Sequence, residues 1–298
     1  MLHKPGLAEI VRMRHSRRVE DPCSIGLHSS HASSGGTRER AESFRAEIRS
    51  TGGGDATINL PIPARSIGCI EFTFGVPYSI RHLDRMRLEI THPATLVGAK
   101  THQRIQLESQ GHTETFTILF QPTGLQMMFG LPGSLLVDEH YDAGAVLGSR
   151  LPELREMLGE AGSFEERVQI ANGFFLAIPA PVLKSREMDS VIRAMIAKNG
   201  CIRVQNLAHD AGLSVRQFER RFITALGISP KVYARILRFE AALHRKSETG
   251  HNWTTLAHDL GYHDQMHMIH DFESLSGKRP KSLTPHLELL ASMAAQSL

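Results

Sequence analysis

The sequence predicts an α+β protein, with a small antiparallel β-barrel or sandwich followed by an all-helical part of two helix–turn–helix units joined by a long helix. Short apolar runs bounded by turn residues fill 58–138, which is typical of short antiparallel strands. A second pattern occurs twice near the C-terminus, over 206–231 and again over 255–281, at offsets of 49 and then 50 residues. A repeat at a fixed offset indicates one supersecondary unit used twice.

The N-terminal part divides into two segments that differ in amino-acid composition and in their pattern of apolar residues. Residues 1–57 contain SSHASSGGTRERAE and STGGGDAT, whose Ser, Gly and charged residues predict a poorly structured segment. Residues 58–178 are expected to form the β-barrel-like domain, with helices over 151–158 and 164–178 at its end. The apolar runs that indicate strands are 69–76, 85–91, 94–99, 104–109, 115–122 and 125–130.

Prolines, glycines and helix-capping residues mark the boundaries of the helical part and of the helices within it. The two prolines of PAPVLKS predict a linker over 179–185. A helix over 187–198 should end at Asn199-Gly200, because this pair is typical of a helix C-terminus. Ser229-Pro230 is an N-cap followed by a first-turn proline and predicts a long helix over 231–246. The tandem unit should occupy 186–285, which leaves 286–298 as a tail.

Each copy of the repeat has the signals of a tight turn followed by a capped helix. Gly212 and Gly261 allow a turn that other residues resist, and Ser214 and Asp264 are suited to cap the helix that follows. Apolar residues at helical spacing predict the buried face of that second helix. They are Phe218, Phe222 and Leu226 in the first copy and Met268, Phe272 and Leu275 in the second.

The opposite face of each second helix carries side chains suited to base edges in a major groove. Arginine donates two hydrogen bonds to guanine, glutamine does so to adenine, and apolar tips contact the thymine methyl. Residues 185–298 also hold 15 Lys and Arg against 11 Asp and Glu, a basic excess that suits DNA. The first helix presents Arg216, Gln217, Glu219, Arg220 and Arg221; the second presents Gln265, Met266, His267, Ile269 and His270. The expected phosphate contacts are Lys278, Arg279 and Lys281.

These residues resemble the AraC/XylS family of transcriptional regulators. The likeness covers 186–285: Leu-Ala, a glycine, a polar cap, an aromatic-bearing helix, then G-x-x-P and a linking helix. The resemblance implies a sequence-specific DNA-binding regulator that reads two successive major grooves. Two departures, His270 in place of the usual Arg and Met268 in place of Phe, imply a weaker grip by the second helix.

The N-terminal part is less specifically similar to the β-barrel sensory domains that precede some members of this family. The resemblance implies that this part binds an effector, mediates dimerisation, or both. The implied partners are a double-stranded DNA operator, a small-molecule effector, a second copy of the chain, and RNA polymerase if the regulator is an activator. We expect a cytoplasmic protein with no membrane partner, because no apolar run is long enough to span a bilayer.

Two other classes of function stay open. One is a small-molecule-modifying barrel enzyme with a helical appendage, and the other is a scaffold that binds DNA without reading its sequence. We expect no catalytic residues and no cofactor, since the chain lacks G-x-S-x-G, a P-loop and G-x-G-x-x-G before a helix. We also expect no metal site, because the three cysteines are scattered and the histidines show no H-x-H pair. The histidines considered are His82, His92, His102, His112 and His140.

Overall fold

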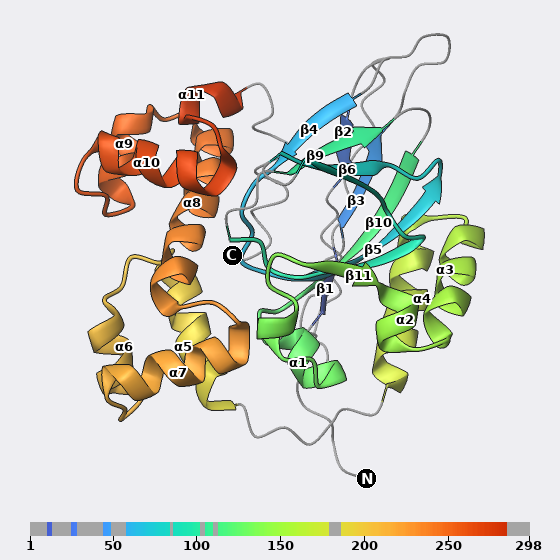
Figure 1. Cartoon of the computed structure of the whole chain (residues 1–298), viewed down its shortest axis with the longest axis horizontal. Coiled ribbons are helices and arrows are strands. Elements are labelled where there is room, and N and C mark those ends of the chain that lie inside the picture. The colour runs from blue at the N-terminus through green and yellow to red at the C-terminus, as the bar shows by residue number, and fades with distance from the viewer. Residues whose placement is uncertain are drawn as a thin grey trace.

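The protein folds into a β-rich part and a helical part, which lie side by side in space (Figure 1). The computed structural model describes residues 58–83, 86–101, 105–109, 113–178 and 186–284, together with three short strands nearer the N-terminus. Those strands fall within 1–57, the segment predicted to be poorly structured, and its other residues lie outside the described ranges. The predicted linker 179–185 and the whole of the predicted tail 286–298 also lie outside the described ranges.

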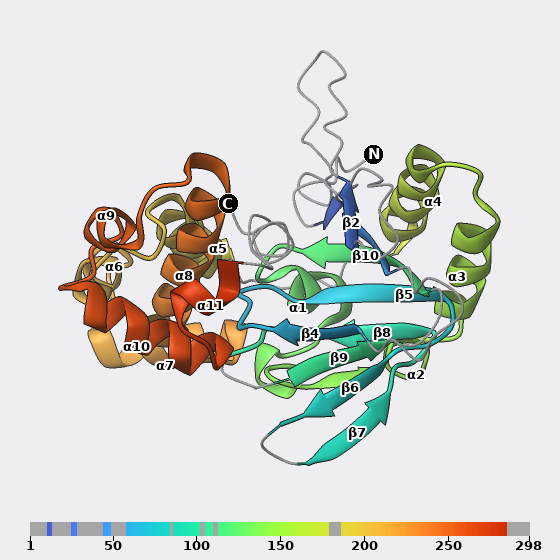
Figure 2. The ribbon, with the colours of Figure 1, turned by 90° about the horizontal axis from the view of Figure 1, so that it is seen from above.

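Two antiparallel sheets form the β-rich part, as the strand-like runs predicted (Figure 2). The larger sheet has the order β11-β8-β5-β10-β3-β2, with β1 also paired to β10. Its strands are β1 (Val11–Met13), β2 (Ile25–His28), β3 (Phe44–Ile48), β5 (Cys69–Gly75), β8 (Ala94–Val97), β10 (Thr113–Phe120) and β11 (His140–Asp142). The smaller sheet has the order β4 (Ile58–Ile62), β9 (Ile105–Ser109), β6 (Ser79–His82) and β7 (Arg87–Ile90). The described strands pair as two separate sheets, so the sandwich alternative fits better than a closed barrel.

Helices cover one end of the larger sheet and complete its core. They are α1 (Gly124–Phe129), the 3-10 turn η1 (Gly133–Leu135), α2 (Ala143–Leu147), α3 (Arg150–Glu160) and α4 (Phe164–Ala177). Phe116 and Phe120 of β10 are buried against Phe164 and Phe175 of α4, with ring centroids 5.8 and 5.7 Å apart. The two helices predicted over 151–158 and 164–178 therefore seal the sheet.

One predicted strand is wrong. The apolar run 125–130 predicts a strand, but this segment forms helix α1. Leu125 and Met128 are three residues apart and both buried, which is helical spacing, and Gly130 ends the helix at a φ of 71°. A short apolar run is compatible with a strand or with a helix, and here the left-handed Gly130 at its end is the feature typical of a helix.

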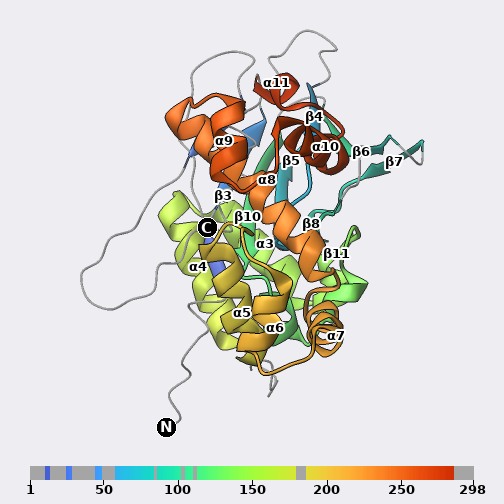
Figure 3. The ribbon, with the colours of Figure 1, turned by 90° about the vertical axis from the view of Figure 1, so that its left-hand side faces the viewer.

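Seven helices make up the helical part within the described ranges. They are α5 (Arg186–Ala197), α6 (Val204–Asp210), α7 (Val215–Leu226), α8 (Pro230–Thr249), α9 (Trp253–Asp259), α10 (Gln265–Ser276) and α11 (Pro280–Leu283). The long helix α8 runs between a group formed by α5, α6 and α7 and a group formed by α9, α10 and α11 (Figure 3). Each predicted helix here exists, and α8 continues three residues beyond its predicted end at Lys246.

The two parts meet through buried polar contacts that we call the β–helical interface. The carboxylate of Glu240 on α8 accepts hydrogen bonds from the backbone N and the Oγ of Ser66, at 2.9 and 2.7 Å. The Oγ1 of Thr123 donates to Asp189 on α5 at 2.6 Å. Other contacts reach the ends of α7 and α10: Gly133 lies against the backbone of Leu226, and the N of Ala64 donates to the carbonyl of Leu275.

Candidate nucleic-acid interface

The first helix–turn–helix unit is α6, a turn and α7. Gly212 has a φ of 64°, so the turn uses the left-handed backbone that favours glycine. The Oγ of Ser214 accepts from the backbone N of Gln217 at 3.3 Å, and the Oε1 of Gln217 accepts from the N of Ser214 at 3.1 Å. This reciprocal capping box starts α7 at Val215. The cap predicted at Ser214 is confirmed.

The second unit repeats this construction in α9, a turn and α10. Asp264 accepts from the backbone N of His267 at 2.7 Å, which confirms the predicted cap. That hydrogen bond, together with His263, lowers the pKa of Asp264, so the cap is a carboxylate at neutral pH. Asn252 caps α9 in the same way and was not predicted, although an asparagine directly before an apolar-periodic run is a usable signal.

Buried aromatic side chains hold both second helices on α8. Phe218 and Phe222 of α7 are fully buried, and Phe222 packs against Tyr233 of α8. In the second unit Phe272 of α10 meets Phe239 of α8 with ring centroids 4.7 Å apart. The predicted buried stripes are thus confirmed, and the opposite faces of α7 and α10 are left to solvent.

The outer face of α7 carries positive charge. The side chains predicted there are all exposed: Arg216, Gln217, Glu219, Arg220 and Arg221. Arg216 and Arg220 lie one helical turn apart, and within the described part of the chain neither forms an ion pair. Ile223 continues the same face with 42% of its surface exposed, and the sequence reasoning missed it. Gln217 is partly committed, because its Oε1 belongs to the capping box.

The outer face of α10 is less cationic. Gln265, Met266, His267 and His270 are exposed, whereas Ile269 is half-buried. The Oε1 of Gln265 accepts from Thr254 on α9 at 3.2 Å. Glu273, which was not predicted, lies one turn beyond His270 and pairs with Arg279 at 2.7 Å. Arg279 is therefore partly neutralised, while Lys278 and Lys281 are exposed beside it.

A buried ion cluster fixes α10 to α8, and sequence reasoning did not find it. Asp271, 4% exposed, accepts from the Nε of Arg235 at 2.8 Å, and its other oxygen lies 3.7 Å from Arg238. The guanidinium of Arg238 also stacks over the ring of Tyr262 at 4.9 Å. The repeat contains a signal that could have identified this cluster. At the position that matches Asp271 the first unit has Arg221, which is exposed, so the two units differ in charge and in burial there.

Comparison with known families matches residues 207–284 to a family described as a helix-turn-helix domain. Residues 207–284 form an AraC-type helix-turn-helix domain. The AraC-type domain spans the turn, cap and second helix of both units, and confirms the resemblance seen in the sequence. Helix–turn–helix domains are typical of DNA-binding proteins, so residues 207–284 are the candidate DNA-binding part of the chain.

Three similar solved structures are each 14% identical to this chain or less. ToxT from Vibrio cholerae O395 is 10% identical, with a TM-score of 0.46 over 83% of this chain and 96% of that one. An unsaturated fatty acid-bound ToxT from Vibrio cholerae strain SCE256 is also 10% identical, with a TM-score of 0.46 over 82% of this chain and 93% of that one. The AraC-like transcriptional activator CuxR is 14% identical, with a TM-score of 0.23 over 68% of this chain and 74% of that one.

A search of curated proteins found no match. Among the described residues, no helix has both the length and the apolar character needed to cross a membrane.

Proposed function

We propose that this regulator reads two successive major grooves, with α7 as the main reader and α10 as a weaker one. The observation that carries the proposal is the pair of exposed arginines on α7, Arg216 and Arg220. Each is free of ion pairs within the described residues, so its guanidinium is available for bidentate contact with guanine. Gln217, Glu219, Gln265, Met266 and Ile269 would adjust base preference, and His267, His270 and Arg221 lie at the flanks.

The two boxes of the operator should lie about 10 bp apart, because both readers are carried on one face by a single helix. Lys278 and Lys281 would contact phosphates next to α10 and position it. The pairing of Glu273 with Arg279 places a carboxylate on the outer face of α10. The outer face of α7 carries three arginines beside Glu219, whereas α10 contains Glu273 and no arginine or lysine, and this difference in charge favours the first unit as the source of most sequence preference.

Selection of binders from a random duplex library by the full chain at physiological salt tests this function. Two enriched boxes about one helical turn apart would support two readers. A single box would mean that α10 does not read bases. Binding without enrichment, with strong dependence on salt, would favour the sequence-blind scaffold instead.

Arg220→Ala should weaken binding to the selected operator by about 1–3 kcal/mol and relax preference within one box. The reason is the loss of a bidentate base contact, while the fold is unaffected because Arg220 is exposed. Fluorescence anisotropy with operator and scrambled duplexes measures both effects. Arg193→Ala on α5 removes the same charge from outside both units and should leave the preference intact. Equal losses on the two duplexes would contradict base reading by Arg220.

We further propose that the β-rich part controls the reader through the β–helical interface. A cavity of about 30 Å³ lies between η1 and the end of α7, with space for only one or two water molecules. An organic effector would therefore have to open this contact before it could bind there. The cavity is lined in part by Ser66, Leu125, Leu136, Ala225, Leu226 and Ile228.

Gly133→Ala should loosen this contact. A Cβ at Gly133 would lie 2.4 Å from the backbone carbon of Leu226, so the two parts must separate. We expect faster hydrogen exchange at the C-terminal end of α7 and a change of at least about threefold in operator affinity. Gly173→Ala on α4 is the matched control, since its Cβ would meet nothing within 4 Å. Unchanged exchange and affinity in the Gly133 variant would exclude control through this contact.

A further inference from the structure

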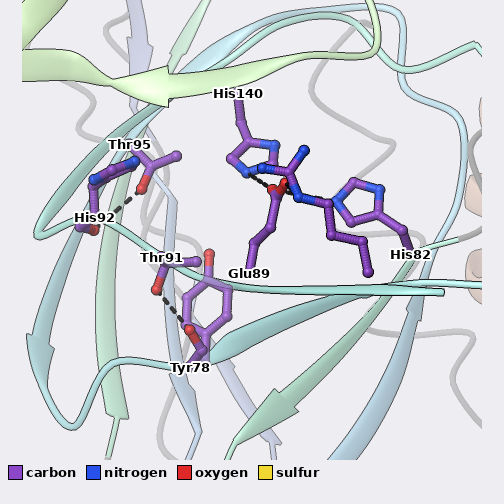
Figure 4. Close-up of polar contacts among 8 residues, drawn as sticks. Tyr78, His82, Glu89, Thr91, His92, Thr95 and His140 are labelled. Carbon is purple, nitrogen blue, oxygen red and sulfur yellow. Dashed lines mark hydrogen bonds and ion pairs between the residues drawn. The ribbon is translucent and has the colours of Figure 1, made fainter. Parts of the chain in front are cut away.

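Three side chains with metal-ligating atoms meet in the β-rich part, away from the AraC-type domain. His82 ends β6, Glu89 lies on β7, and His140 begins β11. Ile80 pairs with Glu89, so Glu89 and His82 are diagonal neighbours on one face of the β6–β7 hairpin. Strand β11 is an edge strand of the other sheet, so the cluster connects the two sheets. Figure 4 shows the three side chains converging, with His92 apart from them.

The distances are those of a compact cluster. The Nε2 of His140 lies 2.5 Å from the Oε2 of Glu89, and the Nε2 of His82 lies 3.3 Å from the same oxygen. One ligand atom from each residue lies within 4.8 Å of the other two. The side chains are 5%, 15% and 12% exposed for His82, Glu89 and His140, respectively. The cluster is therefore largely shielded from water.

Hydrogen bonding alone does not satisfy this cluster. The Nδ1 of His82 is buried and has no hydrogen-bond partner within the described structure. If Nε2 carries the proton and donates to Glu89, then Nδ1 is an unsatisfied acceptor. If Nδ1 carries the proton, then a buried donor is unsatisfied and the Nε2 lone pair faces a carboxylate. A cation between the rings and Glu89 would remove the second of these costs, because it converts the repulsion between the Nε2 lone pair and the carboxylate into coordination, with the proton on Nδ1.

We propose that His82, Glu89 and His140 bind a divalent transition-metal ion of the Zn²⁺ class. Two imidazoles and one carboxylate form a ligand set used by such ions, which leaves a position for water or another ligand. Bonds of about 2.0–2.1 Å in tetrahedral geometry place ligand atoms roughly 3.4 Å apart. The His82–Glu89 distance of 3.3 Å already matches, and the His140–Glu89 distance has to widen by less than about 1 Å. Arg87 holds the other oxygen, Oε1, which leaves Oε2 directed at the two rings.

The chain links this site to the reader. His140 follows η1, whose Gly133 packs against the end of α7. An ion that ties β11 to the β6–β7 hairpin would restrain the segment that contacts α7. This step, unlike the metal site itself, rests on the proposed control through the β–helical interface.

Zn²⁺ titration of the chelator-treated full chain, in competition with a chromogenic chelator, tests the site. We expect one tight ion per chain, and a loss of affinity of about 100-fold or more in Glu89→Gln and in His140→Gln. His92→Gln is the matched control: its side chain is 44% exposed and it lies outside the cluster, so its affinity should equal that of the wild type. Equal binding by all four proteins would overturn the site in favour of surface histidines.

Zn-edge X-ray absorption of the wild type gives an answer even if a variant misfolds. Two imidazoles and a carboxylate per ion support the site, whereas one imidazole, three or more, or sulfur ligation overturns it. Operator affinity measured with and without Zn²⁺ then tests the link to α7. A protein that binds one ion at this site but no operator would retain the metal site and contradict the proposed function.

Discussion

Asp271→Ala is expected to lower the free energy of unfolding by about 3–5 kcal/mol, because it leaves Arg235 and Arg238 without their shared carboxylate in a largely buried site. The loss should be concentrated in the second unit, since Asp271 joins α10 to α8. Urea unfolding gives the free energy, and hydrogen exchange shows where protection is lost. We also expect the second box of the operator to lose its contribution to binding.

Glu273→Ala is the matched control for this change. It removes a carboxylate two residues along α10, but its ion pair with Arg279 is solvent-exposed, with exposed fractions of 37% and 72%. Such a pair contributes less than about 1 kcal/mol. If the Asp271 variant were no less stable than the Glu273 variant, the buried cluster would have no structural role.

Lys100→Met is expected to stabilise the protein by roughly 3 kcal/mol at pH 7. Lys100 is 3% exposed and its Nζ has no hydrogen-bond partner among the described residues. Burial lowers the pKa of this ammonium from 10.5 to about 8, although Asp138 opposes the shift. A protonated Lys100 therefore destabilises the folded state at neutral pH, and methionine, which has a similar length and no charge, removes that destabilisation.

The pH dependence follows with a definite sign. The folded chain releases the Lys100 proton near pH 8, whereas the unfolded chain holds it up to about pH 10.5. Between these values the unfolded state binds more protons, so the contribution of Lys100 to stability rises with pH. Tyr78, Tyr233 and Cys69 have raised pKa values and act in the opposite direction at high pH. Both proteins contain these three groups, so their effects cancel in the difference between the unfolding free energies of wild type and Lys100→Met. Measured by urea unfolding from pH 7 to 10.5, this difference should shrink to near zero.

Local signals account for the parts of the fold that the sequence predicted well. Ser214 and Gln217 are three residues apart, and Phe218 and Phe222 are four apart, so the periodicity of one helix places them. A capping residue and a buried stripe recur at the matching positions of the second unit, Asp264, Met268 and Phe272, and this recurrence distinguishes a real repeat from chance. The run 125–130 had no such support, and its short apolar pattern fitted a strand as well as a helix.

The contacts that sequence reasoning missed join residues that are far apart in the chain. Ser66 and Glu240 are 174 positions apart, and no periodicity relates them. The cluster of His82, Glu89 and His140 depends on the pairing of β6 with β7 and on the placing of β11 beside that hairpin. Spacing along the chain therefore argued against a metal site, whereas the register of two sheets brings the ligand atoms together.

The β-rich part contacts the C-terminal ends of both α7 and α10, through Gly133 at Leu226 and through Ala64 at Leu275. The distance between α7 and α10 is therefore restrained by the β-rich part as well as by α8. An operator whose spacer grows by one base pair moves its second box by about 3.4 Å and rotates it about the duplex axis. No single hinge in α8 would accommodate that change, because a contact to the β-rich part must break too. We therefore expect the N-terminal half to limit how far the spacing of the operator boxes can change before binding is lost.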